Sequence, residues 1–194
     1  MMQVNEIFYS LQGEGCHSGE AAVFVRLSGC NLRCPFCDTD HESGKQTTEE
    51  AIVAETVKYP ARRVVVTGGE PALQLTESLV EALHAAGKLV AVETNGTHTL
   101  PQRVDWVTLS PKDAFLGPQA KPVLTKADEL KVVYDGVHEP MEYTDIAAKY
   151  RFLQPMDCGD PVRNARITAA TVAYIATHPQ WRLSLQIHKM INIK

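Results

Sequence analysis

Short apolar runs rich in β-branched residues recur along the chain, and several are separated by stretches with a helical pattern. Helices are expected from Thr47, where Thr47-Thr48-Glu49-Glu50 fits a capping box, from about Thr76 to Ala86, and from about Ile167 to Thr177. This alternation predicts an α/β fold in which parallel strands are joined by helices. The expected strands are Ala22–Leu27, Arg63–Thr67, Leu89–Glu93, Trp106–Ser110, Leu130–Tyr134, Phe152–Gln154 and Leu183–Ile187.

The length of 194 residues limits how many such units can form. A closed barrel of eight βα units usually needs about 250 residues, so this chain can build about six. Polar or glycine-rich motifs follow directly on the apolar runs, and in a barrel these strand ends meet on one face. We therefore expect one domain over residues 1–194, a partial, open TIM-like βα barrel. Residues 111–128 lack a period and should form a surface loop.

Three cysteines, Cys30, Cys34 and Cys37, lie at C-x3-C-x2-C spacing just after the first apolar run. Three thiolates cannot complete the four-ligand shell of a structural zinc ion. They can hold a [4Fe–4S] cluster by three of its irons and leave the fourth iron open for chemistry. The spacing therefore favours a catalytic cluster.

Two other metal sites are alternatives on the residues alone. A zinc site could be completed by His17 or His41, and a ferredoxin-like electron carrier by Cys16 or Cys158. Five cysteines, an odd number with three in a metal-type motif, indicate a reducing compartment rather than a disulfide framework. We therefore expect Cys16 and Cys158 to be free thiols.

The charge and hydropathy of the chain exclude several classes of partner. The net charge is −4 and no Lys/Arg cluster is present, which counts against nucleic-acid binding and favours a small-molecule substrate. The first residues do not resemble a signal peptide, and no window is long and apolar enough to span a membrane. The expected location is the cytoplasm.

The cysteine motif, with Phe36 directly before its last cysteine, resembles the signature of radical S-adenosylmethionine (SAM) enzymes. In that superfamily the amino and carboxylate groups of SAM chelate the open iron. Gly68-Gly69-Glu70-Pro71 resembles the superfamily's G-G-E-P motif, which receives the SAM ammonium, although alone it could be a tight turn. The resemblance implies further SAM contacts from Phe36, Cys37, Asp38, Gly69, Ser110, Pro111, Lys112, Gln154, Pro155, Met156 and Asp157.

Other segments resemble the 7-carboxy-7-deazaguanine synthase family of radical SAM enzymes nearly from end to end. The most specific are L-Q-G-E-G at Leu11–Gly15 and W-R-L-S-x-Q-x-H-K at Trp181–Lys189. The chain departs from the family's usual ending, where Ile187, Met190 and Ile191 replace a threonine, a tyrosine and a leucine. This difference affects the packing of the tail more than the assignment.

The resemblance implies the contraction of 6-carboxy-5,6,7,8-tetrahydropterin to 7-carboxy-7-deazaguanine with release of ammonia, a step toward 7-deazapurines such as queuosine. It implies a [4Fe–4S] cluster, SAM and Mg²⁺ as cofactors, an electron donor such as flavodoxin or ferredoxin, and a homodimer. Thr39 would bind Mg²⁺, and Glu93 would lie near the reacting carbon. Substrate contacts would come from Leu11, Gln12, Gly13, Arg26, Thr67 and the terminal carboxylate of Lys194.

Arg26 is the one charge in the run Ala22–Leu27, and strand alternation directs its side chain away from Val25 and Leu27 into the barrel. A buried guanidinium needs an anion. That anion could be a structural acid such as Glu14 or Glu93, or a substrate carboxylate held by two parallel hydrogen bonds. The resemblance favours the substrate.

The last stretch, residues 190–193, is apolar enough that we expect it to fold over the barrel opening rather than be wholly solvated. Two rival functions share some of these features. A glycyl-radical-activating enzyme has the same cysteine motif but acts on a protein chain. A non-catalytic Fe–S or zinc module would neither bind nor cleave SAM.

Overall fold

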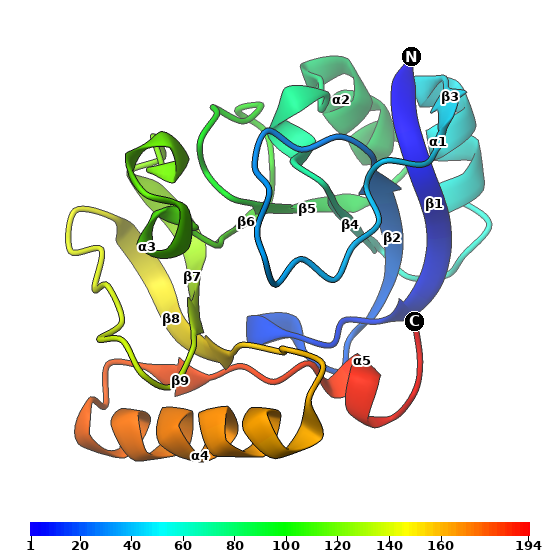
Figure 1. Ribbon diagram of the computed structural model, residues 1–194. Coiled ribbons are helices and arrows are strands. Elements are labelled where there is room, and N and C mark those ends of the chain that lie inside the picture. Colours follow the sequence, from blue (N-terminus) through cyan, green and yellow to red (C-terminus); the bar gives the residue numbers. More distant parts are fainter.

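Nine strands pair into one curved, open sheet in the computed structural model, which describes residues 1–194 (Figure 1). The strand order is β3-β1-β2-β4-β5-β6-β7-β8-β9, so β3 and β9 are edges that do not meet. Strands β2 and β4 to β9 are parallel, whereas β1 and β3 are antiparallel to their neighbours. The strands are β1 Met2–Leu11, β2 Ala21–Leu27, β3 Lys45–Thr47, β4 Arg63–Gly68, β5 Leu89–Thr94, β6 Trp106–Leu109, β7 Lys126–Tyr134, β8 Ala147–Pro155 and β9 Arg182–Leu183.

Three helices have at least two turns, and side-chain caps fix where each begins. They are α1 Glu49–Thr56, α2 Glu77–Ala85 and α4 Pro161–Thr177. Their caps are Thr48, Thr76 and Asp160, and each side chain accepts a hydrogen bond from a backbone N–H of the first turn. The shorter pieces are α3 Asp113–Leu116, α5 Ile187–Met190 and the 3₁₀ turns η1 Gly15–His17, η2 Pro71–Leu73 and η3 Pro118–Ala120. None of these helices has both the length and the apolar character needed to cross a membrane.

The core lies between the sheet and the helices that cover its outer face. Val23, Val25 and Leu27 of β2 are wholly buried in the larger apolar cluster, which also contains residues of β1, β4, β5, α1 and α2. Phe24 and Arg26 point to the other side of the sheet, where both line a cavity. The predicted alternation of β2 is therefore confirmed, and it divides apolar packing from a polar interior.

The predicted α/β class and the open, partial barrel are confirmed, but several boundaries were wrong. The strand expected over Leu183–Ile187 is only Arg182–Leu183, because Ile187 begins α5. Residues 111–128 contain α3, η3 and the start of β7 rather than a plain loop. The helix expected from Ile167 is α4, which begins at Pro161, six residues earlier, with an exposed first turn that carries no apolar period. The cap of α1 is Thr48, since Thr47 pairs with Met2 in the sheet.

Strand β1 was not expected, and it has the largest effect on the site. Its polar and apolar residues do not make an apolar run. It pairs antiparallel with β2 in a register that places Glu6 opposite Arg26 and Leu11 opposite Ala21. The turn from β1 to β2 therefore lies at the amino ends of the parallel strands, opposite the cysteine loop that follows β2.

Glu70 lies inside the fold, which differs from the expectation that its carboxylate receives a ligand ammonium. The side chain is wholly buried. Its Oε1 accepts hydrogen bonds from Thr94 Oγ1 (2.6 Å) and the Ala72 N–H (2.9 Å), and its Oε2 accepts one from the Asn95 N–H (2.7 Å). Glu70 thus ties the end of β4 to the end of β5.

Replacing Glu70 by Ala should lower the free energy of unfolding by about 3 kcal/mol, because two buried donors and one half-buried donor lose their acceptor at roughly 1–3 kcal/mol each. Urea unfolding followed by circular dichroism measures this. The control is Glu81→Ala, which removes an exposed carboxylate that pairs with Arg103 on the surface of α2 and should change stability by less than about 1 kcal/mol. Equal losses in the two variants would show that Glu70 is not a structural anchor.

Candidate functional site

A cavity of about 450 Å³ lies on the inner face of the sheet. This volume is within the range of roughly 300–1,000 Å³ that is typical of small-molecule sites. Four parts of the chain form its walls: the cysteine loop, the carboxyl ends of the parallel strands, the turn from β1 to β2, and the C-terminal tail. The residues predicted for the site line this cavity, with two exceptions: Glu70, which lies inside the fold, and Pro111, which is buried between the lining residues Ser110 and Lys112.

The cysteine loop supplies one wall. All three thiols line the cavity, whereas Cys16 and Cys158 lie outside it and are also free. No group of three or more His, Cys, Asp or Glu side chains converges on a single ion position. An iron–sulfur cluster binds each thiolate through a different iron, so its ligands surround a cube rather than a point. The all-thiolate set thus fits a [4Fe–4S] cluster. The other predicted residues of this wall are Phe36, Asp38 and Thr39.

The glycine pair Gly68-Gly69, at the end of β4, brings the strand end and the cysteine loop into close contact. A Cβ at Gly68 would overlap the backbone of Leu27, and a Cβ at Gly69 would overlap the carbonyl of Gly29. The Gly69 N–H donates to the Leu27 carbonyl (2.9 Å). Gly68 also has a φ of +120°, which side chains disfavour. The pair is therefore both a tight turn and part of the cavity wall.

Lys112 brings a half-buried cation to the carboxyl end of β6. Its Nζ donates to the carbonyl oxygen (2.7 Å) and Oγ (2.6 Å) of Ser110, both of which are neutral. Burial lowers the pKa of Lys112 to about 8. An ammonium with neutral acceptors that faces a cavity can bind an anionic ligand group such as a carboxylate. The other predicted residues at the strand ends are Thr67, Glu93, Gln154, Pro155, Met156 and Asp157.

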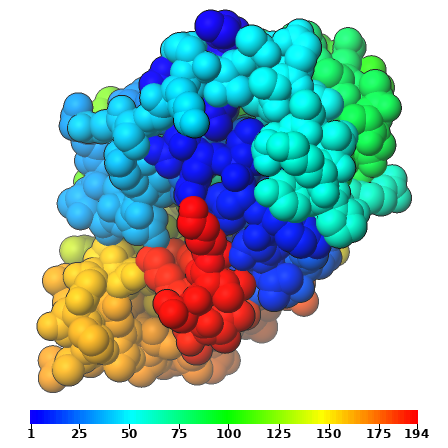
Figure 2. Space-filling model, turned by 90° about the vertical axis from the view of Figure 1, so that its right-hand side faces the viewer, coloured from blue at the N-terminus to red at the C-terminus, as the bar shows by residue number.

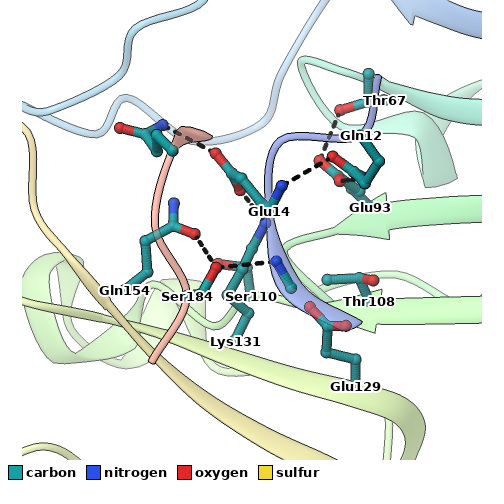
Figure 3. A network of polar contacts seen from close by, with 12 residues as sticks. Gln12, Glu14, Thr67, Glu93, Thr108, Ser110, Glu129, Lys131, Gln154 and Ser184 are labelled. Atoms are coloured by element: carbon teal, nitrogen blue, oxygen red, sulfur yellow. Dashed lines mark hydrogen bonds and ion pairs between the residues drawn. The ribbon is translucent and has the colours of Figure 1, made fainter. Parts of the chain in front are cut away.

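A buried ion pair closes the opposite end of the cavity (Figure 3). The Lys131 ammonium, on β7, bonds to Glu14 Oε2 in the β1–β2 turn, and both side chains are largely buried. Burial alone would raise the pKa of Glu14, but the Lys131 ammonium outweighs it and lowers the pKa to about 2. Burial acts to lower the pKa of Lys131, and the carboxylates of Glu14, Glu93 and Glu129 raise it instead. Both groups are therefore charged at neutral pH.

Two neutral side chains hold Glu93 in the cavity. Gln12 Nε2 donates to Glu93 Oε1 (2.9 Å), and Thr67 Oγ1 donates to Glu93 Oε2 (3.2 Å), as Figure 3 shows. Three residues predicted for substrate binding or catalysis are thus brought together from the β1–β2 turn, β4 and β5. Leu11 and Gly13, from the same turn, line the cavity beside them.

The backbone of the β1–β2 turn is held by hydrogen bonds to the side chains of Glu129 and Ser184. Glu129 accepts a hydrogen bond from the Cys16 N–H (2.8 Å), and burial raises the pKa of Glu129. The Gly15 N–H donates to Ser184 Oγ (3.0 Å), which donates to Gln154 Oε1 (2.8 Å; Figure 3). Gly15 has a φ of +64°, and a Cβ there would overlap Glu129, so this position requires glycine.

Arg26 is paired with an acid that sequence reasoning missed. Its Nε donates to Glu6 Oε1 (3.1 Å), and its Nη1 donates to Thr39 Oγ1 (3.2 Å). A structural acid does lie beside Arg26, but it is Glu6, whereas the two acids suggested from the sequence, Glu14 and Glu93, have other partners. The cause is β1, whose register with β2 places Glu6 beside Arg26. Arg26 nevertheless lines the cavity, as predicted.

The C-terminal tail crosses the cavity, with Lys194 among the lining residues. Ser10 Oγ donates to the Lys194 carbonyl oxygen (2.6 Å), and the Lys194 ammonium pairs with Glu6. The tail therefore lies over the cavity as expected and is not wholly solvated, although Met190 is 70% exposed and Ile191 is 54% exposed. The tail also turns His188 and Lys189 toward the cavity.

Two charged lining residues, Glu6 and Lys131, were not singled out from the sequence, whereas Gln186, His188 and Lys189 were noted only as part of the closing motif, without a role in the site. One local signal was available for β7. Glu129 and Lys131 occupy alternate positions on either side of Leu130, which places both charges on one face of β7, opposite Asp128. No comparable signal marks Glu6.

Comparisons with known proteins agree with this geometry. The model of the radical SAM superfamily matches residues 24–113. The chain is 51% identical to the 7-carboxy-7-deazaguanine synthase of Bacteroides thetaiotaomicron over 194 residues, which is 100% of both chains. It is 44% identical to that of Bordetella pertussis, with 98% of each chain covered. The fold is similar to the crystal structure of QueE from Escherichia coli, with a TM-score of 0.74 and 27% identity over 96% of this chain and 94% of that one.

Replacing Lys131 by Met should leave Glu14 buried without its cation and cost about 3–5 kcal/mol of stability at pH 7.5. The wild-type pair contributes stability above the ordinary pKa of Glu14, and this contribution is lost as pH falls toward 2. In the variant, burial without the cation raises the pKa of Glu14. As pH falls, the carboxylate is protonated, so the free-energy cost of burying its unpaired charge also decreases.

Urea unfolding of both proteins at pH 7.5 and pH 5 checks this prediction. The stability difference should be smaller at pH 5 than at pH 7.5. Lys149→Met is the control, because it removes an exposed pair with Asp128. A difference that stays the same at both pH values would contradict the role given to the Glu14 charge.

Proposed function

Because the chain belongs to the 7-carboxy-7-deazaguanine synthase family of radical SAM enzymes, we propose that it contracts 6-carboxy-5,6,7,8-tetrahydropterin to 7-carboxy-7-deazaguanine with release of ammonia. One structural observation supports this proposal most strongly. The cysteine loop and the L-Q-G-E-G turn, which lie at opposite ends of the parallel strands, face each other across one cavity. A cofactor at one end and a substrate at the other would therefore be in contact.

The cysteine loop and the carboxyl ends of the parallel strands would bind the cofactors, each through different residues. Cys30, Cys34 and Cys37 would hold the [4Fe–4S] cluster, and the hydroxyl of Thr39 would bind Mg²⁺. When bound, the cluster and SAM together supply a 5′-deoxyadenosyl radical that removes a hydrogen atom from the substrate. SAM would lie along the strand ends, in contact with Phe36, Asp38, Gly69, Ser110, Lys112 and the segment 154–157.

The lower part of the cavity would bind the pterin. Arg26 would grip its carboxylate, while Gln12, Gly13 and Thr67 would read the edge of its ring by hydrogen bonds. Glu93 is our candidate for the group that exchanges a proton with the substrate, because both of its oxygens are positioned by neutral donors. The terminal carboxylate of Lys194 would accept hydrogen bonds from the guanidine-like edge.

The chain's own contribution to the reaction is orientation and exclusion of water. The Glu14–Lys131 pair closes the floor, and the tail crosses the opening. A reactive radical in such a site meets the substrate rather than solvent. The enclosed volume also suits a small molecule better than the protein segment that a glycyl-radical-activating enzyme must admit.

The electron donor, the oligomeric state and the pathway of the product rest on the family alone. The electron donor is a flavodoxin or a ferredoxin, and the active form is a homodimer of single-domain chains. We place the enzyme in the cytoplasm, since all five cysteines are unpaired and an exposed cluster motif needs a reducing compartment. Its product serves 7-deazapurine synthesis, such as that of queuosine.

Anaerobically reconstituted protein should hold one [4Fe–4S] cluster and convert the carboxytetrahydropterin to the deazaguanine when given SAM, Mg²⁺ and a reductant. Mass analysis of the product and iron and sulfide analysis check these two results. Replacing Cys30, Cys34 or Cys37 by Ala should abolish both cluster and turnover, whereas Cys16→Ala and Cys158→Ala should keep both. Loss of the cluster in either control would indicate a fully ligated electron carrier instead.

Arg26→Lys should raise KM for the pterin by about 10–100-fold, because the lysine keeps the charge but loses hydrogen bonds to a carboxylate that are worth roughly 1.5–3 kcal/mol. The pair with Glu6 can survive this change, so the fold should be retained. Steady-state kinetics, with SAM affinity measured separately as the control, test the prediction. An unchanged KM, or weakened SAM binding of the same size, would exclude recognition of the substrate carboxylate by Arg26.

A further inference from the structure

Lys189 joins three parts of the chain that are far apart in sequence. Its Nζ lies 2.6 Å from Asp38 Oδ2 and 2.7 Å from Asp157 Oδ2. Asp38 directly follows the last cysteine of the cysteine loop, and Asp157 follows β8. Figure 2 shows the C-terminal segment (red) lodged between the light-blue residues of the cysteine-loop region and the dark-blue N-terminal strand, with the yellow segment after β8 beside it.

One ammonium therefore holds two carboxylates together. The hydrogen bond from Lys189 lowers the pKa of Asp157 to about 2. Burial acts to raise the pKa of Asp38, but Lys189 and Gln186 lower it. Burial acts to lower the pKa of Lys189, and the two carboxylates raise it. All three groups are charged at neutral pH, and without the cation the two like charges would repel each other.

The same short segment also contacts the floor of the cavity. The Ile187 N–H donates to the Gly13 carbonyl (3.0 Å), and a Cβ at Gly13 would overlap the ring of His188. Gln186 Nε2 donates both to Glu14 Oε1 (2.9 Å) and to Asp38 Oδ2 (3.2 Å). Residues 186–189 thus contact two parts of the cavity. One is the proposed SAM wall, at Asp38 and Asp157, and the other is the proposed pterin floor, at Gly13 and Glu14.

We propose that Lys189 is a positioning residue that couples the binding of SAM to the binding of the pterin. SAM orders Asp38 and Asp157, these hold Lys189, and Lys189 keeps His188 and Gln186 closed on the pterin floor. Coupling of this kind is reciprocal, so each ligand must tighten the other by the same factor. The inference rests on the proposed function, because it takes the two walls to be the SAM and pterin sites.

Equilibrium binding to the reconstituted, unreduced enzyme tests the coupling without turnover. The dissociation constant of SAM is measured by titration calorimetry, with and without saturating pterin, and the ratio of the two values reports the coupling. Wild-type protein should show a ratio of about 5 or more, in the usual range of allosteric coupling. In Lys189→Met, which keeps the length and removes the charge, the ratio should fall close to 1.

Two further variants separate positioning from folding. Lys189→Arg keeps the cation and should restore most of the ratio. Lys149→Met, which removes an exposed pair with Asp128 that also measures 2.7 Å, should leave it unchanged. If Lys189→Met does not fold, Asp157→Asn, which removes one of the two carboxylates, should lower the ratio in its place.

A wild-type ratio of 1, or a wild-type ratio preserved in Lys189→Met or in its substitute Asp157→Asn, would overturn the coupling role. Failure of the wild-type protein to bind SAM or the pterin at all would instead count against the proposed function. The two failures are thus distinguishable in one set of titrations.

Discussion

The buried ion pair between Glu14 and Lys131 is the interaction on which the cavity depends. The sheet is open, because its edge strands β3 and β9 do not meet. Glu14, in the turn that follows β1, reaches across the open sheet to Lys131 on β7. Desolvation of two charges costs several kcal/mol each, and the pair must offset this through close contact and further hydrogen bonds. Gln186 supplies one of them, so the same carboxylate anchors both the floor and the tail.

The two ends of the cavity are built by different means. At the carboxyl ends of the strands, paired glycines let β4 pack directly against the start of the cysteine loop. At the amino ends, a charged turn is inserted between strands and held by β7 and Ser184. Backbone contact at one end and ion pairing at the other leave a single polar space between them. That space suits an anionic pterin and a sulfonium cofactor in mutual contact.

Much of this arrangement could be predicted from the sequence. The central strands are largely buried, so each appears in the sequence as an apolar run. Because these strands are parallel, the motifs that follow them were predicted to lie together at one edge of the sheet. β1 could not be found this way, because its residues form neither a plain apolar run nor a regular alternation of polar and apolar residues. With β1 missed, Glu6 was missed as the acid beside Arg26. The pair of Glu14 with Lys131 spans 117 positions, and no local pattern encodes it.

An anaerobic crystal structure of the reconstituted enzyme with SAM and the carboxytetrahydropterin tests the central claim most directly, namely that both ligands share this cavity. We expect the cluster on Cys30, Cys34 and Cys37, SAM along the strand ends, and the pterin over the β1–β2 turn with its carboxylate on Arg26. A pterin bound outside the cavity, or a cluster that takes Cys16 or Cys158 as a fourth ligand, would contradict it.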